Sequence, residues 1–418
     1  MSTIGNTLES PGSAGVGTLF VTGPVDLPHQ AAGKRLLQAL AGAALVGIAA
    51  GIVALFRGHH VMGTSSEVPW GVLIATYVFF VVSSTGLCLV SSLGHVFGFE
   101  VFKPLAKRAV FLALVTLLVG FGVIASELEA PFKLALLAVI SPNPSAPIWW
   151  MGALYGVYMV LIGAELYFLL KDDHHRAKTL GLLSVIAALA AHSNLGAVFG
   201  LQHGRPFWYG PLLPVYFIAS ALLSGAAILI LIVYLGDYFQ GDRTLRRENE
   251  PVIQALRKLL ALFLGVVAFF TVWKVLTGLY GQHYHKYEVT MASLTGPLFV
   301  SFWLFETFLG IVVPLWILLT ERGSQARWVA LAAALPIASI FVLRYNFVVS
   351  GQMFSLKPVV GHLGETLRYS PPFKGNIAGF LPYTPSIVEV LIVVGAMAAT
   401  VLIYVAGARA LRLTGKEA

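Results

Sequence analysis

The chain has 418 residues, of which 57% are hydrophobic and only 11% are charged, with a net charge of +8. Soluble domains are about one quarter charged, so this composition excludes an ordinary water-soluble fold. The single cysteine, Cys88, cannot form an internal disulfide, hold an iron–sulfur cluster or provide a c-type haem attachment pair. Apolar blocks of about 20 residues are long enough to cross a bilayer as helices. We therefore predict an all-α, polytopic membrane protein.

The predicted elements follow one another along the whole chain. Residues 1–33 are rich in Gly, Ser, Thr and Pro and lack Lys and Arg, which indicates a flexible cytoplasmic tail. Residues 34–412 form a transmembrane domain, and 413–418 form a second cytoplasmic tail. A segment at 350–385 contains two adjacent prolines and is expected to form a structured cap or a re-entrant segment. We predict ten transmembrane helices, at 36–56, 69–94, 109–126, 147–170, 179–201, 210–236, 255–280, 292–319, 328–349 and 386–411.

The basic residues predict the orientation of these helices. Of the 27 Lys and Arg residues, 18 lie in the tails and in the loops on the same side as the tails, and 7 lie in the opposite loops. Lys and Arg accumulate in cytoplasmic loops, the positive-inside rule. Both termini are therefore expected in the cytoplasm.

A weak repeat divides the chain. Tyr77 and Gly86 are spaced like Tyr216 and Gly225, and each pair follows a segment rich in Trp and Pro. His192–Ser–Asn194 likewise corresponds to Arg344–Tyr–Asn346. The second to fifth and the sixth to ninth helices then form two four-helix bundles, flanked by the first and tenth helices. Chance similarity between apolar helices remains the alternative.

Ionisable residues within the predicted helices are the candidates for function, because a charge at the centre of a bilayer costs roughly 2.5–3.5 kcal/mol. They form an outer group (Glu127, Glu129, His192, Lys274, Arg344 and Glu389) and a group nearer the cytoplasm (His95, Glu165, Asp237 and Glu306). Structural explanations stay open: interfacial carboxylates, an Arg344–Glu389 ion pair, snorkelling of the inner group and a hydrogen-bonded His192. His95 and His192 are predicted in opposite halves of the membrane, which disfavours paired haem ligation.

Several short motifs resemble, in their order along the chain, those of the NrfD/PsrC family, the membrane subunits of polysulfide-reductase-type complexes. They are Pro69–Trp70–Gly71 with Tyr77 and Gly86, His192–Ser–Asn–Leu–Gly196, Pro206–Phe–Trp–Tyr–Gly–Pro211–Leu–Leu–Pro214, and Tyr383–Thr–Pro–Ser386 with Glu389. The length is similar to the long branch, with hydrogenase-2-type, menaquinone reductase and alternative complex III subunits. The family's Asp–Leu–Gly–Arg–Pro stretch is replaced here by Glu127–Leu–Glu129–Ala–Pro131, without the Gly and Arg.

The resemblance implies a quinone-reactive membrane subunit without haem, in the cytoplasmic (inner) membrane of a bacterium or archaeon. Such subunits dock an iron–sulfur, ferredoxin-like protein on the outer loops, here expected at 57–67, 202–209, 281–290 and 350–385. A catalytic subunit of the molybdopterin or NiFe type, or a multihaem cytochrome, completes the complex.

We accordingly expect a subunit that binds menaquinone or ubiquinone, contains no metal and is not a complete enzyme alone. The alternatives are a secondary transporter, whose broken helices and buried charges are similar, and a b-type cytochrome membrane anchor. The expected catalytic residues are His192, Glu127 and Glu129. The expected quinone-binding residues are His192, Tyr77, Arg344 and Glu389. The expected proton path comprises His95, Glu165, Asp237 and Glu306.

Overall fold

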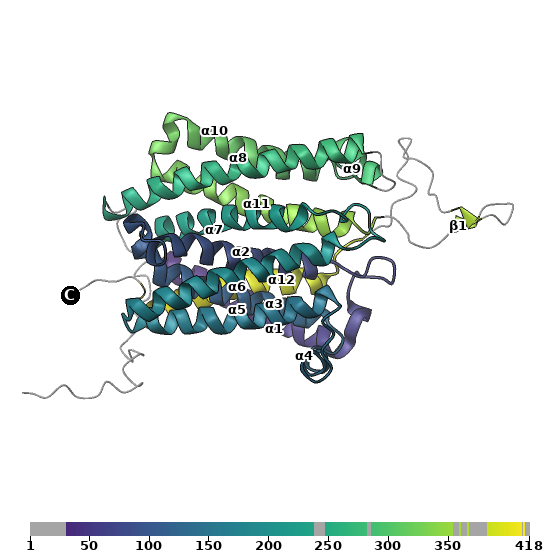
Figure 1. The fold of residues 1–418 in the computed structure, drawn as a ribbon, viewed down its shortest axis with the longest axis horizontal. Coiled ribbons are helices and arrows are strands. Elements are labelled where there is room, and N and C mark those ends of the chain that lie inside the picture. The colour runs from purple at the N-terminus through teal and green to yellow at the C-terminus, as the bar shows by residue number, and fades with distance from the viewer. Residues whose placement is uncertain are drawn as a thin grey trace, which may run out of the picture.

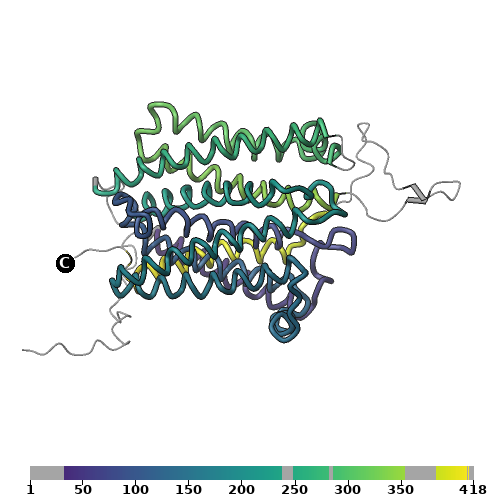
Figure 2. Tube along the Cα trace, viewed as in Figure 1, coloured from purple at the N-terminus to yellow at the C-terminus, as the bar shows by residue number. Residues whose placement is uncertain are grey.

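The computed structural model describes residues 31–237, 247–281, 286–353, 359–360, 366–367, 383–411 and 413. Within them, ten helices are long and apolar enough to cross a membrane, which confirms the predicted all-α, multi-pass architecture. Figures 1 and 2 show these helices lying nearly parallel. They are α1 (Ala31–Arg57), α2 (Val72–His95), α3 (Ala106–Glu127), α5 (Pro147–Leu170), α6 (His174–Gly200), α7 (Leu213–Asp237), α8 (Glu250–Tyr280), η6 continued by α10 (Ser301–Val312 and Val313–Leu319), α11 (Ala326–Ser350) and α12 (Ile387–Ala410).

Two connections differ from the prediction. The expected loop after the third span contains a short apolar helix, α4 (Pro131–Ile140), which is seen nearly end-on in Figure 1. The span predicted at 292–319 is divided, because Gly296 and Pro297 separate α9 (Lys286–Leu294) from η6. The tail at 1–30, the end at 414–418 and most of the cap expected at 350–385 lie outside the described residues. Within that cap, β1 (Val359–Val360) pairs with β2 (Thr366–Leu367) in a two-residue antiparallel ladder.

The ten spans pack as the predicted two bundles with a flanking pair. In the first bundle α2 contacts α3 and α6, and α5 contacts α3 and α6. In the second, α11 contacts α7, α8, η6 and α10, and α8 contacts α7, η6 and α10. Helices α1 and α12 pack together and lie against α3. Figure 1 shows α8, α9 and α10 at one edge of the molecule and α1 and α5 towards the other.

The two bundles meet along α2 and α7. At Gly86 an added Cβ would overlap the carbonyl of Ala221 and the amide of Gly225, and at Gly225 it would overlap Gly86. Glycine is required here because the two backbones are in contact. Trp70 and Trp208 stack with their ring centroids 5.1 Å apart. Each of these contacts therefore joins two residues that hold corresponding positions in the two halves of the sequence repeat.

Two ends of the bundle can be distinguished. We call the end with the α2–α3, α5–α6, α7–α8 and α10–α11 connections the basic end, because it holds Lys107, Lys178, Lys258 and Arg322 among other cations. The opposite end holds α4, α9 and the starts of α2 and α12.

Candidate functional site

His192 lies at the centre of the first bundle, beside the second. It is completely buried on α6. Its Nε2 lies 3.1 Å from the carbonyl oxygen of Phe217 on α7, and its Nδ1 lies 3.2 Å from the hydroxyl of Tyr155 on α5. A carbonyl only accepts, so Nε2 carries a proton, and in the neutral imidazole Nδ1 accepts from the Tyr155 hydroxyl. The imidazole links three helices, α5, α6 and α7.

Arg344 of α11 also lies against Phe217. Its guanidinium is 4.2 Å from the centre of the Phe217 ring, and Nη2 donates to the hydroxyl of Ser220. The side chain is completely buried, and its Nε and Nη1 have no hydrogen-bond partner among the described residues. Because an unsatisfied buried donor is costly, these two N–H groups indicate a place for an acceptor.

Tyr77 of α2 completes what we call the central cluster: Tyr77, Tyr155, His192 and Arg344. Its hydroxyl is also buried without a partner among the described residues. Its ring packs edge-on against Phe121, which packs against Tyr155 in the same way, with centroids 5.8 and 6.0 Å apart. Tyr155 lies close enough to Tyr77 and Arg344 to interact electrostatically with both. The structure therefore brings three predicted site residues together around Tyr155.

The carboxylates form a separate group nearer the opposite end. Glu389 is completely buried at the start of α12, where Oε2 accepts from the amides of Gly63 and Ser386 at 2.8 and 2.7 Å. Its Oε1 accepts from the Tyr383 hydroxyl at 2.8 Å. Glu127 is buried within electrostatic reach of Glu389, and neither of its oxygens has a hydrogen-bond partner among the described residues.

Two expectations for these carboxylates need refinement. Glu129 follows the end of α3 and is exposed, so it lies apart from the buried groups. The considered Arg344–Glu389 ion pair does not occur among the described residues. Glu389 caps α12, with reciprocal bonds to Ser386, because its carboxylate satisfies backbone amides at a helix start.

Tyr383 connects this carboxylate group to the first bundle. The amide of Val72, at the start of α2, donates to the Tyr383 hydroxyl at 2.7 Å, and that hydroxyl donates to Glu389. Burial, followed by the bond to Glu389, raises the pKa of Tyr383 well above its usual range. The hydroxyl therefore stays protonated and keeps donating.

His95 and Glu165 form a close pair near the basic end of the first bundle. His95 Nε2 is 2.8 Å from Glu165 Oε1, and His95 Nδ1 is 3.1 Å from the carbonyl of Ser91. Both ring nitrogens thus face oxygen acceptors. Either the imidazole carries both protons beside a carboxylate, or the carboxyl group donates to a neutral imidazole. In both cases the pair shares one proton.

Tyr158 and Cys88 lie between this pair and the central cluster. The Tyr158 hydroxyl is 3.1 Å from Ser84 Oγ and within hydrogen-bonding reach of the Cys88 thiol, which in turn interacts electrostatically with Glu165. Sequence reasoning missed Tyr155 and Tyr158. Their spacing with Glu165, at i, i+3 and i+10, places all three on one helical face. This periodicity is the sequence signal by which the two tyrosines could have been found.

The remaining predicted residues, Glu306 and Asp237, belong to the second bundle. Glu306 lies on η6, a π-helix, and its Oε1 accepts from Asn346 Nδ2 at 2.5 Å. Asp237 ends α7, and both of its oxygens accept from Asn249 Nδ2, at 3.0 and 2.8 Å. The four residues of the expected proton path are thus divided between the two bundles.

Comparison with known proteins places this arrangement in a family. The profile of the family described as polysulphide reductase, NrfD, matches residues 60–356. The chain is 28% identical to an Hdr-like menaquinol oxidoreductase integral membrane subunit from Archaeoglobus fulgidus, over 90% of this chain and 94% of that protein. It is 24% identical to the C subunit of selenate reductase from Mesobacillus selenatarsenatis, over 76% and 82%, and 27% identical to the C polypeptide of polysulfide reductase from Wolinella succinogenes, over 43% and 55%. Because the family profile matches most of this sequence, the protein belongs to the NrfD polysulphide reductase family.

Proposed function

We propose that the protein is the quinone-binding and quinol-binding membrane subunit of a respiratory oxidoreductase complex. Its family membership and the names of its relatives, a menaquinol oxidoreductase subunit among them, support a quinone-linked role. The observation that carries the proposal is the central cluster, where buried donors that have no partner within the described part of the chain adjoin a Tyr155–His192 hydrogen bond.

The free donors suit the chemistry of a quinone head group. A quinone presents two carbonyl oxygens that accept hydrogen bonds, and the cluster offers the Tyr77 hydroxyl together with Nε and Nη1 of Arg344. A hydrogen bond from a charged donor is roughly twice as strong as one from a neutral donor. We propose that Tyr77 and Arg344 hold one quinone carbonyl in the half of the membrane nearest the opposite end. Glu389, as the cap of α12, supports the loop that leads to Tyr77.

In this proposal His192 does not contact the quinone directly. Both of its nitrogens are already bonded within the protein, so it acts through Tyr155. When the Tyr155 oxygen receives a proton from the quinol, its own proton moves to His192 Nδ1. Oxidation of one quinol releases two protons and two electrons. The first proton is taken by the Tyr155–His192 pair, and the second follows by the same route once His192 has returned its proton through Tyr155 to the path towards the basic end. An iron–sulfur cluster of a partner subunit would supply the electron acceptor.

The polar side chains between Tyr155 and the basic end form the proposed proton path. We propose that protons move between Tyr155 and the basic end through Tyr158, Cys88, Glu165 and His95, and that Glu306 and Asp237 form a shorter path in the second bundle. Glu127, buried near the opposite end without hydrogen-bond partners among the described residues, is proposed to exchange protons with that side, together with the exposed Glu129.

The placement in the cell follows from the charge asymmetry. We propose that the basic end faces the cytoplasm of a bacterium or archaeon, with both termini on that side. The iron–sulfur subunit docks at the opposite end, and a catalytic subunit or a multihaem cytochrome binds to it. Purified complex should therefore contain these partners.

The test is the exchange of His192 for alanine in the assembled complex. We expect quinol-linked turnover to fall by about 10²-fold, the scale for a lost proton-transfer group, whereas turnover of the partner subunits with an artificial electron donor stays unchanged. His192→Gln keeps a polar side chain but no titrating nitrogen and should lose as much activity. The matched control is His175→Ala, an exposed histidine at the basic end of the same helix, α6. Near-normal quinol turnover in both His192 variants would show that His192 serves packing alone.

A further inference from the structure

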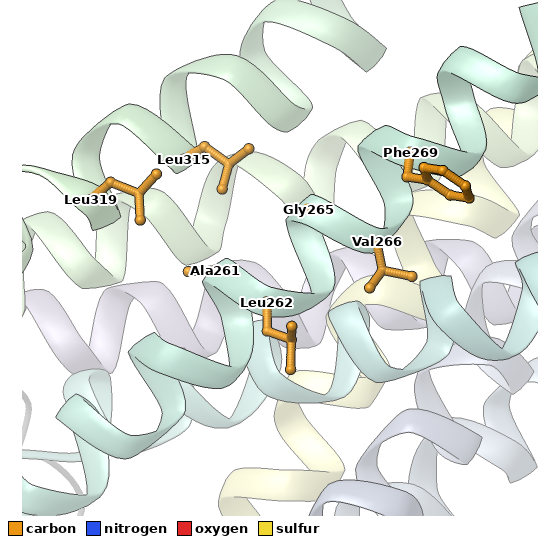
Figure 3. A pocket seen from close by; sticks show the side chains of 7 residues that line it. All are labelled: Ala261, Leu262, Gly265, Val266, Phe269, Leu315 and Leu319. Carbon is orange, nitrogen blue, oxygen red and sulfur yellow. The ribbon is translucent and has the colours of Figure 1, made fainter.

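A groove runs along the outer face of the second bundle, between α8 and α10. It has a volume of about 640 Å³ and is lined from α8 by Ala261, Leu262, Gly265 and Phe269, and from α10 by Leu315 and Leu319. Figure 3 shows the two leucines pointing from α10 towards α8. An added Cβ at Gly265 would meet no atom within 4 Å, so the groove is open at its middle.

The dimensions of the groove match one leaflet of a bilayer. The stretch of α8 from Ala261 to Phe269 rises about 12 Å at 1.5 Å per residue. Half of the bilayer hydrocarbon is about 15 Å thick. Because the lining is apolar and the groove runs along the helices, it suits a hydrocarbon chain that lies parallel to them.

Two cations lie where the groove reaches the basic end. Lys258 is four residues before Leu262 on α8, so both side chains lie on the same helical face. Arg322 follows Leu319 by three residues, and its guanidinium lies over Trp316 at 4.5 Å and Trp328 at 5.1 Å from the ring centres. The two aromatic rings hold this charge in place at the depth where the hydrocarbon groove ends.

The neighbouring contacts join α8 to α10 at this end of the groove and do not compensate the two charges. Arg257 donates through Nε to the carbonyl of Leu318 at 2.9 Å and through Nη1 to Gln254 at 3.2 Å, which ties α8 to the end of α10. Neither Lys258 nor Arg322 forms an ion pair within the described residues, although the exposed Glu321 adjoins Arg322. The site thus combines an apolar groove with two exposed positive charges.

We propose that this groove is a binding site for an anionic phospholipid of the leaflet at the basic end. One acyl chain lies between α8 and α10, and the phosphate binds Lys258 and Arg322. Basic pockets between transmembrane helices recognise anionic head groups in this way. A neutral lipid or a quinone would occupy the groove without using either charge, so the two cations decide between these ligands.

Native mass spectrometry of the purified, delipidated complex tests the proposal by titration with phosphatidylglycerol and with phosphatidylcholine. We expect the wild type to prefer phosphatidylglycerol by about tenfold or more, as suits charged hydrogen bonds. The double variant Lys258→Gln with Arg322→Gln should remove this preference. Gly265→Leu should weaken the binding of phosphatidylglycerol by filling the groove.

Matched controls separate the site from general effects of charge and size. Gly156 is an exposed α5 glycine at which an added Cβ also meets no atom within 4 Å, so Gly156→Leu should leave lipid binding unchanged. Lys178→Gln removes an exposed charge at the same end and should also have no effect. Equal binding of the two lipids by the wild type would overturn the proposal, as would a preference that survives both the double variant and Gly265→Leu. An affinity that Gly265→Leu lowers equally for both lipids would show a site for neutral chains instead.

Discussion

The two bundles have corresponding helices but different interiors. In the first, polar side chains follow one another from His192 through Tyr155, Tyr158 and Glu165 to His95, all of them buried or nearly so. In the second, η6 is a π-helix, and α8 and α10 leave an open apolar groove between them. A π-helix is rare and is often found at functional sites. The first bundle thus holds the longer of the two proposed proton paths, and the second combines the shorter one with a fixed charge and a lipid-facing surface.

The comparison is clearest at the residues that correspond in the repeat. The contacts between the bundles are symmetrical, Gly86 with Gly225 and Trp70 with Trp208. His192 and Arg344 correspond too, but one is a neutral imidazole that can accept a proton, whereas arginine stays charged. The contact between the two bundles is therefore symmetrical, while the polar residues inside each bundle differ.

The largest expected effect breaks the contact between the bundles. Gly86→Leu places a side chain where the backbone of α7 lies, so we expect almost no folded protein in the membrane, because neither helix can move without separating its bundle. Fluorescence-detected size-exclusion chromatography measures this. Gly122→Leu in α3, where an added Cβ meets no atom within 4 Å, should fold normally. Wild-type levels of folded Gly86→Leu would refute the shared interface.

The next effect compares the buried acidic residues at the basic end of each bundle. Glu165→Ala leaves His95 without its partner, and breaking a buried pair costs roughly 3–5 kcal/mol. Asn249→Ala in the second bundle removes the hydrogen bonds from a neutral side chain to Asp237 and should cost about 1–2 kcal/mol. Denaturant unfolding in detergent micelles measures both losses. Equal losses would mean that the His95–Glu165 pair is no stronger than an ordinary hydrogen bond.

A third prediction compares two tyrosines in the proposed reaction. Tyr155→Phe removes the hydroxyl that donates to His192, and we expect quinol-linked turnover to fall by about tenfold or more. Tyr216→Phe, in the second bundle, should change turnover by less than about twofold, because its hydroxyl lies within reach of the Thr271 hydroxyl on α8, which does not titrate, and outside the path proposed through Tyr155. Steady-state assays of the complex at saturating quinol provide the measurement. A larger loss of turnover for Tyr216→Phe than for Tyr155→Phe would mean that protons move mainly through the second bundle.

The smallest effect concerns the attachment of α12 to the first bundle. Tyr383→Phe loses the bonds to Val72 and Glu389 and should lower stability by about 1–2 kcal/mol. Since the pKa of Tyr383 is raised in the folded protein, this contribution is complete below the ordinary tyrosine value near 10 and declines at higher pH. The difference in unfolding midpoint between the wild type and Tyr383→Phe should therefore be constant from about pH 6 to 9, a range in which tyrosine stays protonated. Tyr345→Phe, whose ring lies 6.2 Å from that of Tyr383, is the control. A difference that changes across this range would assign the titration to another group.

The number of spans and the two-bundle arrangement could be predicted from the amino-acid sequence. Apolar blocks must be covered by lipid, and this requirement is local, so each block predicts its own helix. The same reasoning selected His192 and Arg344, because ionisable side chains within apolar helices are rare, whereas Tyr77 was selected through the sequence repeat and the family motif. It missed α4, which is too short to span the membrane, and the break at Gly296 and Pro297, which lies inside an apolar stretch.

Which of these residues meet depends on the tertiary structure. Glu389 binds the amide of Gly63, 326 residues away, and not Arg344, since the packing of α12 against α1 brings that loop to the start of α12. Glu127 is buried and Glu129 is exposed, although both are carboxylates two residues apart, because α3 ends between them. Tyr155 lies at the centre of the site because its hydroxyl contacts His192 on another helix. Such contacts depend on how the helices are rotated against one another, and hydropathy along a single segment does not contain that information.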